Sequence, residues 1–147
     1  MRLAVGIDIG GTNTKFVLVS EDGKVLKSEQ RPTPLSSALK NAKMDDLLVR
    51  DLKEFMKNCP EKTGIAGIGL GVAGLIDRKN GKVIESPNIT AINNLSIREK
   101  LENEFSLPVI LENDANPYAY GEKWVGAVKD HNNFLLLTLG TGLGGGL

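Results

Sequence analysis

Three segments near the start of the chain, two of them apolar and the third mostly polar, predict three β-strands. The first covers residues 3–7, and the second, at residues 15–19, follows after a short loop that contains glycine. A tight turn at residues 21–24 precedes a third run at residues 25–31. Because the connections are short, we expect the three strands to pair antiparallel as a meander.

Beyond residue 31 the pattern changes to helices that alternate with buried strands. Pro32 and Pro34 indicate a break in regular secondary structure. Apolar residues then recur at helical spacing between residues 47 and 56. Residues 65–72 form a glycine-rich apolar run without charge, which is typical of a strand inside a sheet.

The second half of the chain continues this alternation. Ser96 and Glu99 have the spacing of a capping box, which predicts a helix that runs to about Phe105. The remaining expected elements are a strand at residues 108–111, a helix at residues 115–128 and a strand at residues 134–139.

The order of these elements predicts the fold class. Three antiparallel strands are followed by helix, strand, helix and strand, and the helical connections are long enough for parallel pairing. We therefore expect an α/β fold with a mixed five-stranded sheet flanked by helices.

Composition narrows the classes of function. The 147 residues carry 18 Lys and Arg against 18 Asp and Glu, which gives no electrostatic support for nucleic-acid or membrane binding. No secretory leader or run of membrane-spanning length is visible, so a cytoplasmic protein is expected. Cys59 is the single cysteine, which excludes a disulfide within the chain and a cysteine zinc cluster.

The loop between the first two strands carries the strongest chemical signal. Asp8 lies at the end of the first strand, and Gly10, Gly11 and Thr12 follow it after one residue. Consecutive glycine amides with a short hydroxyl side chain can form an anion-binding concavity. Since a carboxylate would repel a bare phosphate, we expect Asp8 to meet Mg²⁺ or its water shell. An ordinary hairpin, whose glycines only supply positive φ, is the alternative.

Two common nucleotide motifs do not fit. The spacing G-x-G-x-x-G occurs at residues 69–74 and 140–145, but neither stretch opens a helix as the dinucleotide motif requires. A Walker A sequence is absent as well.

Asn113 and Asp114 follow a predicted parallel strand, at the sheet edge where open α/β folds bind ligands. A carboxylate there can orient an attacking hydroxyl group and accept its proton. A simple helix N-cap before Ala115 is the alternative interpretation of Asp114.

Five motifs in order resemble the ROK family of sugar kinases and related repressors, within the actin and hexokinase fold superfamily. They lie at residues 8–12, 71–77, 86–89, 112–122 and 139–146. The resemblance implies an actin/hexokinase-like (ribonuclease H-like) lobe, and transfer of the γ-phosphoryl group of ATP, with Mg²⁺, to a hexose hydroxyl, usually on carbon 6.

The resemblance also implies roles for individual residues. Asp114 matches the catalytic base, and Asp8 is expected to hold Mg²⁺ through water. The sugar ligands would be Gly74, Asn94, Asn113 and Asp114. The ATP phosphates would be bound by two glycine loops that comprise Asp8, Gly10, Gly11, Thr12, Asn13, Lys15, Gly140, Thr141, Gly142 and Gly144.

The chain departs from the family pattern around the sugar side. Ala73 stands where many members have proline, and residues 90–92 stand where many have tryptophan. Pro117, Tyr118 and Tyr120 replace a run that is commonly small and alanine-rich. These departures bear on which sugar is used.

The resemblance predicts a first lobe at residues 1–113 and the start of an incomplete second lobe at residues 114–147. The expected partners are a hexose and the missing C-terminal lobe, with a homodimer left open and neither nucleic acid nor membrane. We expect the 147 residues alone to be inactive, and the strand at residues 134–139 to be disordered, irregular or paired with another molecule.

Two other functions stay open. The first is the sugar-sensing domain of a ROK repressor, although Asp8 leaves little room for a preceding DNA-binding motif. The second is another phosphotransferase or ATPase of the same superfamily.

Overall fold

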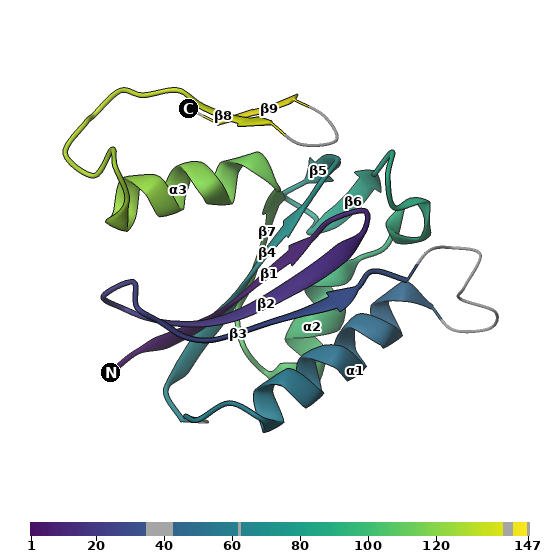
Figure 1. Cartoon of the computed structure of the whole chain (residues 1–147). Helices are drawn as coiled ribbons and strands as arrows, with labels where there is room; N and C mark the ends of the chain where they lie inside the picture. Colours follow the sequence, from purple (N-terminus) through teal and green to yellow (C-terminus); the bar gives the residue numbers. More distant parts are fainter. Residues whose placement is uncertain (35–42, 62, 140–142, 147) are drawn as a thin grey trace.

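The computed structural model describes residues 1–34, 43–61, 63–139 and 143–146. Its strands and helices follow the predicted order (Figure 1). The elements are β1 (Leu3–Ile9), β2 (Asn13–Ser20), β3 (Val25–Pro32), α1 (Met44–Lys57), β4 (Ile65–Val72), β5 (Leu75–Asp77), β6 (Lys82–Glu85), the 3₁₀ turn η2 (Thr90–Ile92), α2 (Ile97–Phe105), β7 (Val109–Asn113), α3 (Ala115–Val125), β8 (Leu136–Leu139) and β9 (Leu143–Gly146).

The central sheet has the strand order β3-β2-β1-β4-β7. The β1–β2 and β2–β3 pairs are antiparallel, whereas β1–β4 and β4–β7 are parallel. The predicted mixed five-stranded sheet is therefore confirmed. Because β1, β4 and β7 run in the same direction, their carboxyl ends meet at one edge of the sheet.

Helices α1 and α2 cover one face of this sheet (Figure 1). The apolar positions of α1 recur every three or four residues, so Leu48, Leu52 and Phe55 all point into the core and are buried. Phe55 stacks on Phe16 of β2, with 5.7 Å between the ring centroids. Burial of this apolar stripe, rather than helix propensity alone, holds α1 on the sheet.

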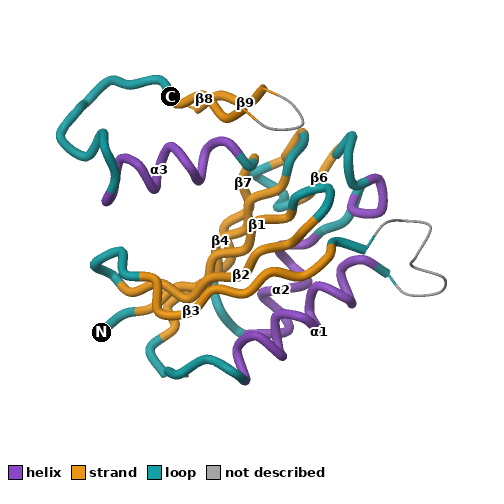
Figure 2. The backbone as a smooth tube through the Cα atoms, in the orientation of Figure 1, coloured by secondary structure: helices purple, strands orange, loops and turns teal. Residues whose placement is uncertain are grey.

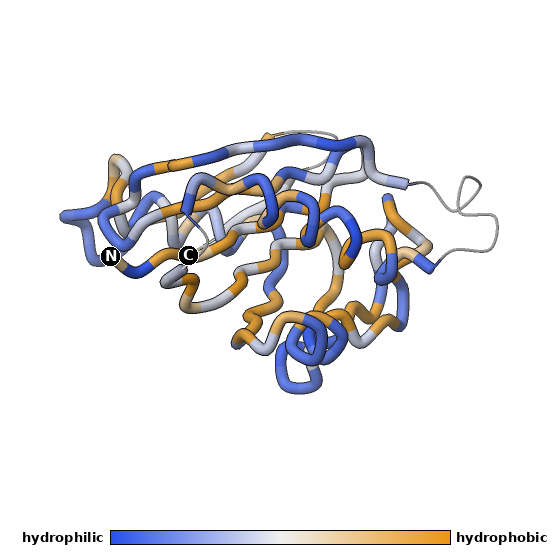
Figure 3. The backbone as a smooth tube through the Cα atoms, turned by 90° about the horizontal axis from the view of Figure 1, so that it is seen from below, coloured by the Kyte–Doolittle hydropathy of each residue, from blue (hydrophilic) through white to orange (hydrophobic). Residues whose placement is uncertain are grey.

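The edge strand β3 is mostly hydrophilic, as Figure 3 shows up to the grey segment that follows it. Its Arg31 pairs with Asp51 and Glu54 of α1, at 3.3 and 2.9 Å. Charged side chains at this edge protect the exposed backbone groups of β3 from pairing with another chain.

Helix α3 lies on the opposite face from α1 and α2 (Figures 1 and 2). Its first turn packs on β4, where a side chain at Gly71 would contact Pro117. Its last residue, Val125, touches the β2–β3 turn at Gly23. Among the described residues, no helix is both long and apolar enough to cross a bilayer.

A strand is present within residues 134–139 as predicted, but the prediction that it would be disordered, irregular or paired with another molecule was wrong. Residues 136–139 form β8, which pairs antiparallel with β9 of the same chain. The glycine-rich residues 143–146 looked like loop because glycine carries no strand signal, but they adopt the extended conformation that supplies the partner. The hairpin packs against α3 (Figure 2).

The predicted capping box was also wrong, although α2 begins where it was expected. Ser96 occupies the N-cap position, but its side chain makes no capping hydrogen bond. Its backbone, with φ −84° and ψ 66°, is not in the extended conformation that directs a capping side chain toward the first helical amides. Residues 75–77, directly after the glycine-rich stretch at residues 69–74, form the short strand β5 paired with β6.

Candidate active site

The carboxyl edge of the sheet brings Asp8 and Asp114 together. Asp8 lies opposite Gly71 in the β1–β4 register. The amide of Asp114 donates to the carbonyl oxygen of Val72 at 3.1 Å. Because Gly71 has no side chain, the Asp114 backbone can approach to the point where a Cβ on Gly71 would lie 3.7 Å from the Asp114 Cα.

The phenol of Tyr118 connects α3 to this carboxylate pair. Its Oη donates to Asp8 Oδ2 at 3.0 Å. Burial raises the pKa of Tyr118, and the negative charges of Asp8 and Asp114 and the bond to Asp8 raise it further. Tyr118 therefore stays protonated and acts as a donor. The sequence marked it only as a departure from the family pattern, not as a site residue.

The first glycine loop, residues 10–13, has a fixed shape. The Gly10 amide donates to the Asn13 carbonyl oxygen at 3.0 Å, so this amide is engaged within the loop. Thr33 directly follows β3. Its amide donates to the Thr12 carbonyl oxygen at 2.9 Å, and its hydroxyl donates to the Gly10 carbonyl oxygen at 2.7 Å. Thr33 is buried, and these two hydrogen bonds hold the loop in place.

The outward side of this loop is open. Thr12 and Lys15 have exposed side chains. A side chain at Gly11 would lie 3.2 Å from the Cβ of Asn88, so glycine lets the loop pack closely against the segment after β6. Among the described residues, no hydrogen bond engages the amide of Gly11 or Thr12. These two amides are the donors that the loop can offer to an anion.

Asn113 and Asp114 join the end of β7 to the start of α3. Asn113 Nδ2 donates to the Gly74 carbonyl oxygen at 2.9 Å, which ties two predicted sugar ligands together. Asp114 Oδ1 accepts from the Ala115 amide at 3.0 Å, as does Asn113 Oδ1. Asp114 thus takes the N-cap position of α3, and this leaves its second oxygen for another partner.

Glu112 braces this turn and was missed by sequence reasoning. Its carboxylate is buried, and Oε1 accepts from the Asn113 amide at 2.8 Å and from Asn116 Nδ2 at 3.0 Å. Arg78 also forms an ion pair with this carboxylate, with 2.9 Å between Nη2 and Oε1. An acidic residue at the end of an otherwise apolar strand is the signal that could have identified it.

The other two predicted sugar ligands lie in irregular backbone. Gly74 has φ +150°, and a side chain there would meet the Glu85 carbonyl oxygen at 2.2 Å. Asn94 has φ 62°, and its amide donates to the Val83 carbonyl oxygen at 2.7 Å. The structure links Gly74 directly to Asn113, whereas no hydrogen bond among the described residues links Asn94 to Asp114.

The second glycine loop lies only partly within the described residues. Gly140, Thr141 and Gly142 fall outside them. Gly144 belongs to β9, and a side chain there would lie 3.4 Å from the Ala115 Cβ. The hairpin that carries this loop is therefore packed against the start of α3, next to Asp114.

The donor set suits a magnesium ion that is held mainly by phosphate. Within the described part of the chain, no group of three or more His, Cys, Asp or Glu side chains could hold a metal by itself. Mg²⁺ is commonly bound by one or two carboxylates together with substrate phosphates and water. Asp8, half-exposed beside an open glycine loop, fits that arrangement.

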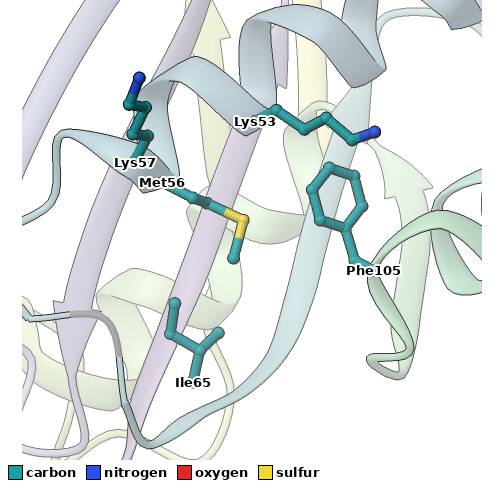
Figure 4. Close-up of a pocket in the computed structure, with 5 residues that line it drawn as sticks. All are labelled: Lys53, Met56, Lys57, Ile65 and Phe105. Carbon is teal, nitrogen blue, oxygen red and sulfur yellow. The ribbon is translucent and has the colours of Figure 1, made fainter.

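A separate hollow lies away from these residues. It has a volume of about 350 Å³ and is lined by Lys53, Met56, Lys57, Ile65 and Phe105. Figure 4 shows the thioether and the apolar side chains facing this hollow. Ile65 is the first residue of β4, whereas the carboxylate pair lies at the opposite end of that strand. The hollow offers few polar groups and is not the candidate site.

Known proteins with similar sequences and structures identify the family of this chain. A glucokinase from Thermotoga maritima is 41% identical over 143 residues, which cover 97% of this chain and 43% of the relative. A glucokinase from Streptomyces coelicolor is 36% identical over 147 residues, or 44% of its length. Among solved structures, this chain superposes on a ROK family glucokinase from Streptomyces griseus in complex with glucose and AMPPNP, with a TM-score of 0.80 and 34% identity. The match covers 97% of this chain and 43% of that protein.

The chain thus spans less than half the length of these relatives and corresponds to their N-terminal portion. Their shared architecture confirms the predicted actin/hexokinase-like lobe. The sequence profile of the ROK family matches residues 4–147, and the chain belongs to that family.

Proposed function

We propose that this chain is the first lobe of an ATP-dependent hexose kinase, which transfers the γ-phosphoryl group to a sugar hydroxyl, the 6-hydroxyl of glucose or a related hexose. The observation that carries the proposal is the meeting of Asp8, the clamped first glycine loop and Asp114 at one edge of the sheet. This arrangement pairs an anion-binding loop with a carboxylate that can accept a proton.

Asp114 is the proposed catalytic base. Its Oδ1 is engaged by the Ala115 amide, and no hydrogen bond from a described residue occupies Oδ2, which would accept the proton of the sugar hydroxyl. The bonds that Glu112 makes to the Asn113 amide and the Asn116 side chain hold the turn that presents Asp114. Phosphoryl transfer through a loose transition state depends on such positioning more than on a strong base.

The first glycine loop and Asp8 are the proposed contacts of the nucleotide. The amides of Gly11 and Thr12 and the side chain of Lys15 would bind phosphate oxygens, and Asp8 would hold hydrated Mg²⁺. Asn13 and Gly10 would shape this loop, and the second glycine loop, with Gly140, Thr141, Gly142 and Gly144, would bind phosphate from the other side. When bound, ATP and Mg²⁺ supply the transferred phosphoryl group and offset its negative charge.

The proposed sugar contacts are Asn113, Gly74 and Asn94, together with Asp114. Support comes from the bond between Asn113 and Gly74, and from relatives that are named glucokinases, one of them crystallised with glucose. The remaining part of the hexose and nucleotide sites would come from a second lobe. We propose that this lobe begins at residue 114, with α3 contacting both the sheet and the β8–β9 hairpin.

A coupled assay on the complete protein tests the function. Hexoses are supplied one at a time with ATP and Mg²⁺, and nucleoside diphosphate release is followed. We expect sugar-dependent turnover and a sugar 6-phosphate as the product. No turnover with any hexose, combined with sugar-released binding of the complete protein to its own promoter, would instead establish a repressor.

A further inference from the structure

The hydroxyl group of one tyrosine holds the carboxylate of Asp8, the residue before the last of β1. Tyr118 Oη donates to Asp8 Oδ2 across 110 positions of sequence, at 3.0 Å. The bond joins the first turn of α3 to the strand that leads into the first glycine loop. It therefore fixes one part of the proposed nucleotide site to the part that carries Asp114.

The chain reaches this geometry through the residue before the tyrosine. Pro117 is the third residue of α3, where a proline costs no helical hydrogen bond. Its ring packs against β4 at Gly71, where even a Cβ would lie 3.4 Å from Pro117 Cγ. Because the first turn of α3 packs so closely on the sheet, the side chain of Tyr118 is long enough to reach Asp8. Pro117 and Tyr118 are two of the three positions at which this chain departs from the small, alanine-rich run of the family.

The bond leaves half of the carboxylate available. An ionised carboxylate has two oxygens and about four acceptor positions. Tyr118 takes a position on Oδ2, and no hydrogen bond among the described residues engages Oδ1. A carboxylate fixed at one oxygen presents the other in a defined direction, which spares the loss of side-chain freedom when a cation binds.

We propose that Tyr118 is a positioning residue that holds Asp8 so that Oδ1 meets the hydrated Mg²⁺ of the nucleotide. This inference rests on the proposed function, since it names the group that orients the metal contact of that site. A tyrosine that merely tied α3 to the sheet would affect stability, or the binding of free and magnesium-bound nucleotide equally. A positioning tyrosine affects only the magnesium-dependent part of nucleotide affinity.

Calorimetric binding of AMP-PNP to the complete protein separates the two roles. The affinity is measured with Mg²⁺ and again with EDTA, for the wild type and for Tyr118→Phe. We expect Tyr118→Phe to weaken binding about tenfold with Mg²⁺, as the loss of a hydrogen bond to a charged group predicts, and to leave binding in EDTA unchanged. Equal affinities with Mg²⁺ in the two proteins, or equal losses with and without it, would overturn the inference.

Tyr120→Phe is the matched control. Tyr120 lies on the same helix, is 62% exposed, and its hydroxyl makes no hydrogen bond to a described residue. We expect this variant to bind AMP-PNP as the wild type does under both conditions. A loss equal to that of Tyr118→Phe would show that any phenol on α3 matters, and would contradict a specific role for Tyr118.

A double-variant cycle makes the test independent of overall stability. If Tyr118 acts through Asp8, adding Tyr118→Phe to Asp8→Asn should cause no further loss of magnesium-dependent affinity. A further tenfold loss would overturn the inference. If instead the wild type binds no AMP-PNP and phosphorylates no sugar, the proposed function itself fails, and that result is distinct from an active wild type with an unaffected Tyr118→Phe.

Discussion

Gly74 shows how strictly single positions are determined around the site. Its φ of +150° and the Glu85 carbonyl oxygen, 2.2 Å from where a Cβ would lie, both exclude a side chain. We expect Gly74→Ala to lower the free energy of unfolding by about 3 kcal/mol or more, because backbone strain adds to the clash. Chemical denaturation of the 147-residue chain measures this change.

Gly121→Ala is the control for that substitution. Gly121 lies inside α3, and a Cβ there would have no neighbour within 4 Å. We expect this variant to be more stable than the wild type by about 0.5–1 kcal/mol, since alanine favours the helix over glycine. A Gly74→Ala protein as stable as Gly121→Ala would contradict the packing described here.

The residues that the sequence predicted for the site carry local signals. Asp8 lies two residues before a pair of glycines, and Asp114 follows the end of a buried strand, so each could be recognised from its neighbours alone. Thr33 and Tyr118 could not, because their roles depend on contacts that only the folded chain creates. Thr33 reaches Gly10 across 23 positions, and Tyr118 reaches Asp8 across 110.

At the scale of elements, β9 packs against α3 through small residues on both sides. A side chain at Gly146 would lie 2.8 Å from the Ala119 Cβ, whereas one at Gly145 would have its nearest neighbours at 3.8 Å. We therefore expect Gly146→Ala to loosen the hairpin at a cost of about 1–3 kcal/mol, typical of overpacking. Amide hydrogen exchange along β8 should become faster, by tenfold for each 1.4 kcal/mol or so.

Gly145→Ala is the matched substitution on the same strand. Because its added methyl group meets only ordinary contacts, β8 should exchange at the wild-type rate. Similar exchange in the two variants would mean that β9 does not rest on α3 as the structure shows.

The elements that the sequence predicted well are those with a strong apolar periodicity. The strand β1 and the helix α1 bury regular stripes, and the continuous apolar run of β4 is equally visible in the sequence. Pairing of β8 with β9 is not visible there, because residues 143–146 contain three glycines and lack the side chains that mark a strand. The Ser96 cap failed because the spacing of Ser96 and Glu99 does not reveal the backbone dihedrals of Ser96, which are not extended.

At the scale of the whole molecule, the chain carries only one of the two sides of the proposed site. Phosphoryl transfer requires groups aligned on both the nucleotide and the sugar, and the chain spans 43% of the length of the Thermotoga relative. We expect the 147-residue chain to show no appreciable sugar-dependent ATP turnover in the assay in which the complete protein is active. Turnover at about 1 s⁻¹ or more, the rate of an ordinary kinase, would show that the second lobe is dispensable.

The central claim is that Asp114 accepts the proton of the sugar hydroxyl beside the Asp8 loop. The most direct measurement is kcat of the complete protein and of its Asp114→Asn variant with saturating hexose and ATP, with Asp130→Asn, an exposed carboxylate beyond α3, as the control. We expect Asp114→Asn to lower kcat by about 10²–10⁴-fold with the fold intact, and Asp130→Asn to leave it unchanged. An Asp114→Asn protein that turns over at the wild-type rate would contradict the account.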